Sequence, residues 1–269
     1  MNNLIKRAVF GGLFVVVFIA CLWWGKLSSI FFFALVGGIA LAEIILMLYP
    51  NKLNRLIIHF MFVPITMSLI LNLRSYLNNQ VSLGAFISLS LFLFLLLIVQ
   101  LFSSRKIIFM GRVSEALLAT TYSLFPFILL VLFCLRYEPI LLIGISIIIW
   151  ANDTFAYLVG RKIGKSKLFP RISPNKTWEG TIGGLICALA IALFIHPVFF
   201  DDLSRIDWFF VGLIAIIFGS IGDLIESMFK RYYGIKDSGN IIPGHGGVLD
   251  RFDALMGAIP FVFAYLFFV

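Results

Sequence analysis

The sequence predicts an all-α polytopic membrane protein with about nine transmembrane helices, and two observations support this fold class. Hydrophobic residues make up 61% of the 269 positions, Phe alone occurs 30 times, and the mean hydropathy is +1.06. An ordinary soluble domain is only about 45–50% apolar. Apolar runs of about 20 residues, the length of helix that crosses the hydrocarbon core of a bilayer, recur along the whole chain.

The apolar runs define the predicted spans, and no polar stretch between them is long enough to form a second, soluble domain. Trp24-Gly25-Lys26 separates the first two runs so closely that we expect a tight turn there. We therefore expect a single transmembrane domain over 1–269, with spans at 8–24, 27–49, 56–74, 81–102, 114–135, 139–160, 178–199, 208–229 and 252–269.

The distribution of cations predicts the orientation of the chain. Cytoplasmic segments of membrane proteins carry an excess of Lys and Arg. With nine spans and a cytoplasmic N-terminus, 17 of the 21 cations fall on the inner side, and the outer side keeps only Lys26, Arg74, Arg136 and Arg205. We therefore expect the N-terminus in the cytoplasm and the C-terminus outside.

The stretch Ser227–Asp253 departs most from the composition of the chain, which is only 13% charged. Asp250 and Asp253 are spaced i,i+3 at the start of the last span, so both carboxylates share one helical face. Pro243-Gly244-His245-Gly246-Gly247 lets the backbone turn sharply and approach a ligand closely. We interpret this stretch as a binding site rather than a solvated connection, because acids and bases alternate in it: Lys230, Arg231, Lys236, Asp237, Asp250, Arg251 and Asp253.

A second polar group follows the sixth span. Asp153 lies in the cytoplasmic half of that span, where a lone carboxylate would be costly. The loop after it carries six cations, including Lys176, and Ser173 and Thr177 are candidate N-caps of the seventh helix. The amides at that helix N-terminus would favour a phosphate. A basic loop that binds lipid headgroups would explain the cations, but not Asp153 or the glycines.

The eighth span ends in the same way. Asp223, Glu226 and Ser227 are spaced i,i+3 and i,i+4, so one helical face carries all three. Clustered acids at low dielectric repel one another unless a cation neutralises them. Carboxylate oxygens favour Mg²⁺ or a similar ion, and His and Cys are too scattered to favour zinc. We expect four carboxylates to meet at the cytoplasmic end of three spans: Asp153, Asp223, Asp250 and Asp253.

Glu43 lies in the second apolar run, after Gly37-Gly38, and is the one suggestive residue of the first five spans. A carboxylate at that depth is expensive unless it faces the protein interior. Two interpretations stay open: a functional acid, or a buried acid that is hydrogen-bonded to a neighbouring helix. Because the sequence places no other acid beside it, we expect Glu43→Gln to have a milder effect than changes at Asp223 or Asp250.

The polar residues near the C-terminus form one continuous pattern, Ser227-x-Phe229-Lys230-Arg231-x4-Lys236-Asp237-x-Gly239-x2-Ile242-Pro243-x-His245-Gly246-Gly247-Val248-x-Asp250-Arg251-Phe252-Asp253. This pattern resembles the signature of the phosphatidate cytidylyltransferases, also called CDP-diacylglycerol synthases. The upstream run is similar to a second block shared by that family, and the close match covers about 150–253. That run reads Asp153…Tyr157…Gly160-Arg161…Gly164…Ser173-Pro174-x-Lys176-Thr177-x-Glu179-Gly180.

The resemblance implies a reaction and roles for the residues. Phosphatidate would attack the α-phosphate of CTP, which gives CDP-diacylglycerol and pyrophosphate for phospholipid biosynthesis. It implies Mg²⁺ at Asp223 and Asp250, with Asp253 near a second cation. Catalysis would involve Asp223, Asp250, Lys230, Arg231 and Lys236. Substrate binding would involve Asp153, Lys176, Ser227, Asp237, His245, Gly246, Gly247 and Arg251, with the loop glycines letting backbone amides approach phosphates.

The resemblance also implies an organisation and a location. N-terminal spans would occupy 1–135 and a catalytic half 136–269, with cytoplasmic loops at 161–177 and 230–251. The protein would be a multi-pass protein of the inner (cytoplasmic) membrane, with its active site facing the cytoplasm. We expect CTP, phosphatidate and the bilayer as partners, and no nucleic acid. The oligomeric state stays open, with a homodimer as one arrangement.

Two alternatives remain. A CTP-dependent polyprenol kinase of the same superfamily would transfer the γ-phosphoryl group and release CDP instead of pyrophosphate. A transporter would hold its charged site near the bilayer centre between repeats. Here the acids are predicted at one membrane face and no repeat is evident, which disfavours the transporter.

The orientation can be tested with a reporter fused after Val269. A reporter that is active only in the cytoplasm should be silent there, because the C-terminus is predicted outside. A bright reporter would show that the span count or the orientation is wrong.

Overall fold

The helices agree with the predicted spans to within a few residues wherever both can be compared. The computed structural model describes residues 3–48, 112–199, 203–239, 241 and 246–269, together with 91, 94, 95, 97, 98, 101 and 102. The span predicted at 56–74, most of the span at 81–102, and His245 lie outside the described residues. The helices within the described ranges are α1 (Asn3–Trp23), α2 (Lys26–Leu48), α5 (Arg112–Arg136), α6 (Ile140–Ile163), α7 (Trp178–Phe199), α8 (Arg205–Tyr232) and α9 (Leu249–Phe268).

Five of the described helices are long and apolar enough to cross a membrane, judged by length and composition. They are α2, α6, α7, α8 and α9, while α1 and α5 contain shorter apolar stretches at Val9–Trp23 and Thr121–Arg136. The turn predicted between the first two spans is confirmed, since Gly25 links α1 to α2 with φ of +112°, a conformation that favours glycine. The class of helical membrane protein is thus supported, and the count of nine stays a prediction.

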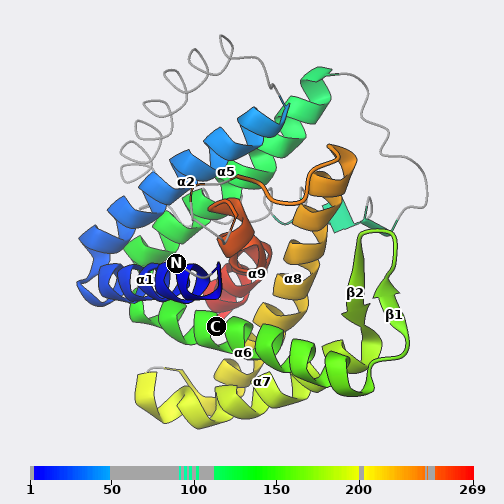
Figure 1. The fold of residues 1–269 in the computed structure, drawn as a ribbon. Helices are drawn as coiled ribbons and strands as arrows, with labels where there is room; N and C mark the ends of the chain where they lie inside the picture. Colours follow the sequence, from blue (N-terminus) through cyan, green and yellow to red (C-terminus); the bar gives the residue numbers. More distant parts are fainter. Residues whose placement is uncertain are drawn as a thin grey trace.

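Helix α9 occupies the centre of the described bundle (Figure 1). It packs along α8 on one side and against α5 on the other, while α2 runs beside α5 and α6 runs beside α7. The Phe252 ring, at the first turn of α9, is buried where these helices meet. Its centroid lies 5.6–6.4 Å from five rings of α1, α2 and α5: Phe14, Phe18, Phe32, Phe33 and Phe127.

Glycines let α8 and α9 approach each other closely. A Cβ atom on Gly222 would lie 2.5 Å from the Asp253 carbonyl oxygen and 2.7 Å from the Gly257 Cα. Contacts this short require the absence of a side chain at the crossing. The close approach brings Asp223, the neighbour of Gly222, within reach of Asp253 on the facing helix.

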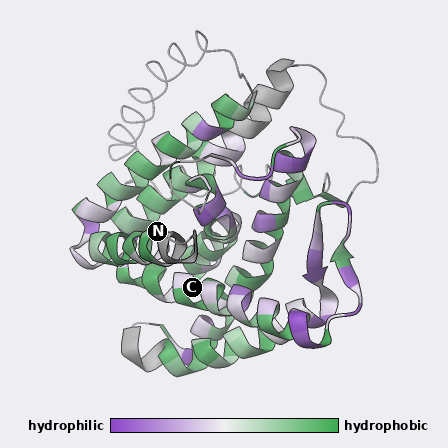
Figure 2. Cartoon of the chain, in the orientation of Figure 1, coloured by the Kyte–Doolittle hydropathy of each residue, from purple (hydrophilic) through white to green (hydrophobic). Residues whose placement is uncertain are grey.

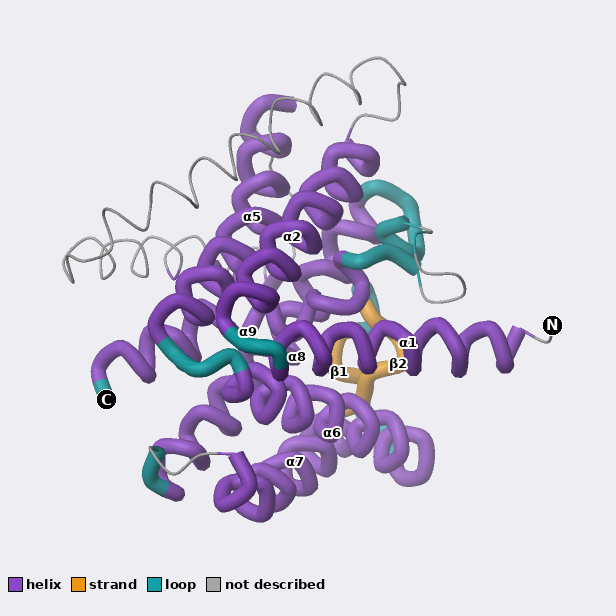
Figure 3. The backbone as a smooth tube through the Cα atoms, turned by 90° about the vertical axis from the view of Figure 1, so that its left-hand side faces the viewer, coloured by secondary structure: helices purple, strands orange, loops and turns teal. Residues whose placement is uncertain are grey.

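A short two-stranded sheet, which the sequence did not predict, adds to the helical fold. Strands β1 (Lys167–Phe169) and β2 (Ser173–Thr177) pair antiparallel inside the loop predicted at 161–177. The hairpin carries hydrophilic residues over most of its length and lies at the right-hand edge of the view in Figure 2. In Figure 3, turned by 90°, the two strands lie behind α1. Its base is held to α7, because the amides of Lys165 and Ser166 donate to the Glu179 carboxylate at 3.1 Å. These local strands carry no alternating apolar pattern, so the sequence did not reveal them.

The connection between α8 and α9 is shorter than predicted. Helix α8 continues to Tyr232 and α9 begins at Leu249. The loop was expected over 230–251, but residues at both of its ends belong to the helices, so Lys230, Arg231 and Asp250 are helical. Helical geometry, with side chains at i,i+3 and i,i+4 on one face, consequently sets the directions of these groups.

The glycine crossing gives a test of the packing. Gly222→Ala should destabilise the protein by about 1–3 kcal/mol, the usual cost of overpacking a tight contact. Gly12→Ala in α1 is the matched control, because no atom of the described residues lies within 4 Å of a Cβ atom placed there. Melting temperatures in detergent should fall for the first variant only. Equal melting temperatures for the Gly222 variant and the wild type would contradict the tight crossing.

Candidate active site

The four acids predicted to converge line one cavity. This cavity, of about 630 Å³, lies among α6, α8, α9 and β2. Asp153 comes from α6, Asp223 from α8, and Asp250 and Asp253 from α9. Its other lining residues include polar groups of α6, the hairpin and α7, namely Asn152, Tyr157, Arg161, Asn175, Lys176, Thr177 and Thr181.

One face of α8 supplies a ladder of polar side chains. Asp223, Glu226, Ser227 and Lys230 follow one another at helical spacing, as predicted for the first three. The Ser227 hydroxyl donates to Asp223 Oδ1 at 3.4 Å, and the Lys230 ammonium pairs with Glu226 Oε2. This helix therefore carries both signs of charge into the site.

Two lysines neutralise part of the acid cluster. Lys176 Nζ lies 2.5 Å from Asp223 Oδ2, and the two side chains are 29% and 30% exposed. Lys230 Nζ lies 2.6 Å from Asp250 Oδ1, and these side chains are only 10% and 8% exposed. Burial alone would lower the pKa of Lys176, but the adjacent Asp223 carboxylate outweighs burial and raises this pKa above its ordinary value. Lys176 is thus an ammonium at neutral pH.

Three carboxylates are close enough to share a cation. One oxygen each from Asp223, Glu226 and Asp253 lie within 4.8 Å of one another. Glu226 is fully buried, and the Lys230 ammonium pairs with its Oε2, while Oε1 has no hydrogen-bond partner among the described residues. Carboxylate oxygens are the ligand type that hard cations take, so this group could hold one, and Mg²⁺ stays a prediction. The sequence placed Glu226 on this face without assigning it to the metal.

Asp250, a metal ligand in the sequence-based assignment, is instead surrounded by donors from its own chain. Oδ2 accepts from the Ser238 amide at 2.9 Å, the Ser238 hydroxyl at 3.0 Å and the Gly247 amide at 2.8 Å, while Oδ1 pairs with Lys230. Gly246 has φ of +81°, and a Cβ atom there would lie 2.5 Å from Asp250 Oδ2. Asp250 therefore holds Lys230 and the loop in place. The Gly247 amide, expected near a phosphate, is engaged with Asp250 in this structure.

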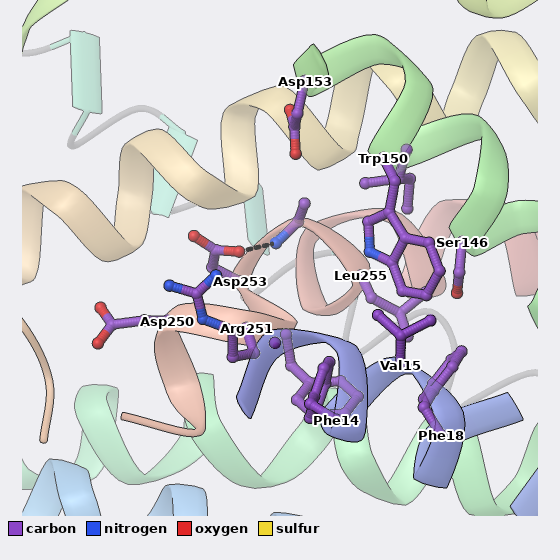
Figure 4. Close-up of a pocket in the computed structure, with 14 residues that line it drawn as sticks. Phe14, Val15, Phe18, Ser146, Trp150, Asp153, Asp250, Arg251, Asp253 and Leu255 are labelled. Atoms are coloured by element: carbon purple, nitrogen blue, oxygen red, sulfur yellow. Dashed lines mark hydrogen bonds between the residues drawn. The ribbon is translucent and has the colours of Figure 1, made fainter. Parts of the chain in front are cut away.

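A second cavity, of about 330 Å³, meets the same acids from the apolar side. Its walls include Phe14, Val15 and Phe18 of α1 and Trp150 of α6. Figure 4 shows these apolar side chains on one side and carboxylates on the other. Both cavities are lined by Asp153, Asp250 and Asp253, and the apolar one also by Arg251. The polar cavity and the apolar cavity are thus adjacent, and the same three carboxylates line both.

Other predicted residues lie outside the two cavities. Arg231 donates to the Ile235 carbonyl at 2.9 Å and the Ile172 carbonyl at 3.4 Å, so it joins the end of α8 to the hairpin. Lys236 and Asp237 are exposed on the loop and line neither cavity. Their contact with substrate stays a prediction.

Thr177 caps α7, as one of the two predicted candidates. Its Oγ1 accepts from the Gly180 amide at 3.2 Å, immediately before the helix starts at Trp178. Since Lys176 precedes the cap, the hairpin delivers this lysine to the cavity beside the N-terminus of α7. Helix N-termini favour negative charge, so the position suits a phosphate.

These features define a helical membrane protein with an acid-and-lysine site beside an apolar cavity. The chain belongs to the family described as the cytidylyltransferase family, whose sequence pattern matches residues 5–269. The resemblance seen in the sequence is thereby confirmed.

Similar proteins carry the name phosphatidate cytidylyltransferase. The relative from Staphylococcus saprophyticus is 38% identical over 256 residues, which cover 91% of this chain and 92% of that protein. Relatives from Staphylococcus aureus (strain COL) and Bacillus subtilis are 53% identical over 116 residues and 48% over 120. These two matches cover 42% and 45% of this chain and span less than half of each relative, 44% and 45%.

Cation binding can separate the two ligand sets. The affinity of the purified protein for Mn²⁺, without substrates, can be measured by electron paramagnetic resonance. This affinity should fall at least about tenfold in Glu226→Gln, because loss of a group that only supports a metal ligand already costs about that much. Asp250→Asn should change Mn²⁺ affinity much less, because its oxygens already have donors. The opposite ranking would restore the set Asp223, Asp250 and Asp253.

Proposed function

We propose that the protein transfers the cytidylyl group of CTP to phosphatidate, forming CDP-diacylglycerol and pyrophosphate in phospholipid biosynthesis. The observation that carries this proposal is the pair of cavities, one polar and one apolar, which share Asp153, Asp250 and Asp253. A reaction between a water-soluble nucleotide and a membrane lipid needs this kind of boundary. The names of the relatives agree with it.

Each cavity suits one substrate. The polar cavity offers Lys176 and Arg161 to the triphosphate of CTP. The apolar cavity offers Phe14, Phe18 and Trp150 to the glycerol and the first acyl carbons of phosphatidate. Arg251 lines the apolar cavity beside the shared acids, where it would pair with the phosphate of the lipid.

The chemistry requires no dedicated general base. A phosphomonoester has a second pKa of about 6, so the attacking oxygen of phosphatidate is ionised at neutral pH. Its lone pair forms a bond to the α-phosphorus of CTP. The bond from that phosphorus to the α–β bridging oxygen breaks, and the oxygen leaves with the bonding electrons as part of pyrophosphate. The task of the protein is to position two anions and to neutralise the departing charge.

Charge balance argues for a metal ion in this reaction. Two anionic substrates would be repelled by the acid cluster, in which five described acids outnumber four described cations. The acids are Asp153, Asp223, Glu226, Asp250 and Asp253, and the cations are Lys176, Lys230, Arg161 and Arg251. Asp223, Glu226 and Asp253 would hold Mg²⁺, with Asp253 also near a second cation, and the bound ion would supply Lewis-acid stabilisation of the phosphoryl oxygens. Lys176, which is partly exposed, would turn from Asp223 to a phosphate oxygen.

The orientation and the membrane also belong to the proposal. We place the acid cluster at the cytoplasmic face of the inner membrane, where CTP is available. The 17-to-4 distribution of cations supports this placement.

The assay follows release of pyrophosphate from CTP by purified protein with phosphatidate and Mg²⁺. Asp223→Asn and Asp250→Asn should each lower kcat at least about 10²-fold, the scale of losing one strong electrostatic contact in a transition state. Both variants should stay folded, because Lys176 remains partly exposed and Lys230 keeps Glu226 as a partner. Excess chelator should abolish turnover.

Several results would count against the proposal. Release of CDP instead of pyrophosphate would indicate the kinase alternative, and the absence of either product would refute nucleotide chemistry. Full turnover in excess chelator would refute the metal assignment but not the enzyme activity. Loss of folding in both Asp variants would assign their lysine pairs a structural role.

A further inference from the structure

Glu43 of α2 is a buried acid that belongs to neither cavity, yet it contacts the segment that builds the site. Its side chain is 1% exposed. Oε1 accepts from the Val248 amide at 2.8 Å, and Oε2 accepts from the Leu249 amide at 2.8 Å and lies 3.1 Å from the Ser238 hydroxyl oxygen. Of the two interpretations left open by the sequence, the structure shows the acid that is hydrogen-bonded to a neighbouring helix.

The two amides that donate to Glu43 belong to the residues at the start of α9, Val248 and Leu249. This helix receives no side-chain cap from its own N-cap residue, Val248. Unpaired amides at a buried helix N-terminus are costly, and a negative charge there is favourable. Glu43 therefore caps α9 from another helix, and Asp250 takes the preceding amide, that of Gly247.

A continuous chain of contacts leads from Glu43 into the site. The Ser238 hydroxyl lies 3.1 Å from Glu43 Oε2 and 3.0 Å from Asp250 Oδ2, and Asp250 in turn holds Lys230. The expectation that Glu43 has no neighbouring acid is therefore wrong: one hydroxyl separates it from Asp250. The Ser238 hydroxyl has one proton and donates it to one of the two carboxylates at a time, so the positions of both carboxylates depend on the same side chain.

The glycines of the loop leave room for this carboxylate. A Cβ atom on Gly247 would lie 2.5 Å from Glu43 Oε2, and one on Gly239 would lie 2.7 Å from Oε1. The loop backbone is thus wrapped around the Glu43 head group from two sides. The arrangement is more specific than a simple pairing of one acid with one donor.

We infer that Glu43 is a positioning residue for the reaction site. It fixes the first turn of α9 and Ser238, and through them the Asp250 carboxylate and the Lys230 ammonium. An amide cannot replace it, because the nitrogen of Gln would face a backbone or hydroxyl donor at one of the two oxygen positions. The inference rests on the proposed function only in that Asp250 and Lys230 serve that reaction.

The test combines hydrogen exchange with kinetics on Glu43→Gln. Amide exchange in a peptide covering 246–251 should become at least about tenfold faster, because the capped amides lose their acceptor. Under the proposed function, kcat should fall by about 10- to 100-fold, as expected for a small misplacement of reacting groups, with KM for phosphatidate little changed. The Glu43→Asp variant, which keeps the charge, should be intermediate.

Asp207→Asn is the matched control. Asp207 also accepts hydroxyl hydrogen bonds, from Ser204 at 2.5 Å and from Tyr265 of α9 at 2.9 Å, but near the opposite end of α9. The same carboxylate-to-amide change there should leave exchange in 246–251 and kcat near wild type. The double variant Glu43→Gln/Ser238→Ala should be no slower than Glu43→Gln alone if Glu43 acts through Ser238.

The outcomes are distinguishable. Unchanged exchange in 246–251, whatever happens to kcat, would overturn the inference, and so would faster exchange with unchanged kcat. Should Glu43→Gln fail to fold, the same two measurements on Glu43→Asp and Ser238→Ala decide it by the same criteria. A wild-type protein that makes no CDP-diacylglycerol would refute the proposed function, while the exchange comparison would still test the cap.

Discussion

Carboxylates removed from water have to be matched by hydrogen-bond donors or positive charge, and this constraint organises the described part of the chain. Glu43 is matched by the first amides of α9, Asp250 by Ser238, Gly247 and Lys230, and Asp223 by Lys176. The matches to Glu43, Asp223 and Lys230 each join segments that are distant in sequence. Helix α9, the connection before it and the hairpin are therefore positioned by the same contacts that neutralise the acids.

The membrane spans and the convergence of four acids could be predicted from the sequence because both follow from simple patterns. Hydropathy and helical length located α6 to α9 to within a few residues. Polar residues at the ends of apolar runs indicated Asp153, Asp223, Asp250 and Asp253, which line one cavity. The N-cap at Thr177 followed from its residue type just before a helix.

The division of labour among the acids could not be predicted, because it depends on tertiary contacts. Asp223 and Glu226 share a face of α8, a pattern visible in the sequence, but only the packing of α8 on α9 shows Glu226 beside Asp253. Asp250 gains its donors from a loop whose geometry depends on Gly246. The β-hairpin likewise has no apolar alternation, and its base is set by Glu179.

The cap on α9 has a consequence for the order in which the protein is made. Glu43 lies 205 and 206 residues before the two amides that it accepts. During synthesis α2 is made long before α9, so Glu43 lacks these two donors until α9 is in place. An unmatched carboxylate within a membrane span is costly. Helix α9 thus supplies the hydrogen-bond donors that the buried acid of α2 requires. A chain that ends before Leu249 would leave an unmatched acid in its N-terminal half, a defect that quality-control proteases recognise through the poor packing it causes.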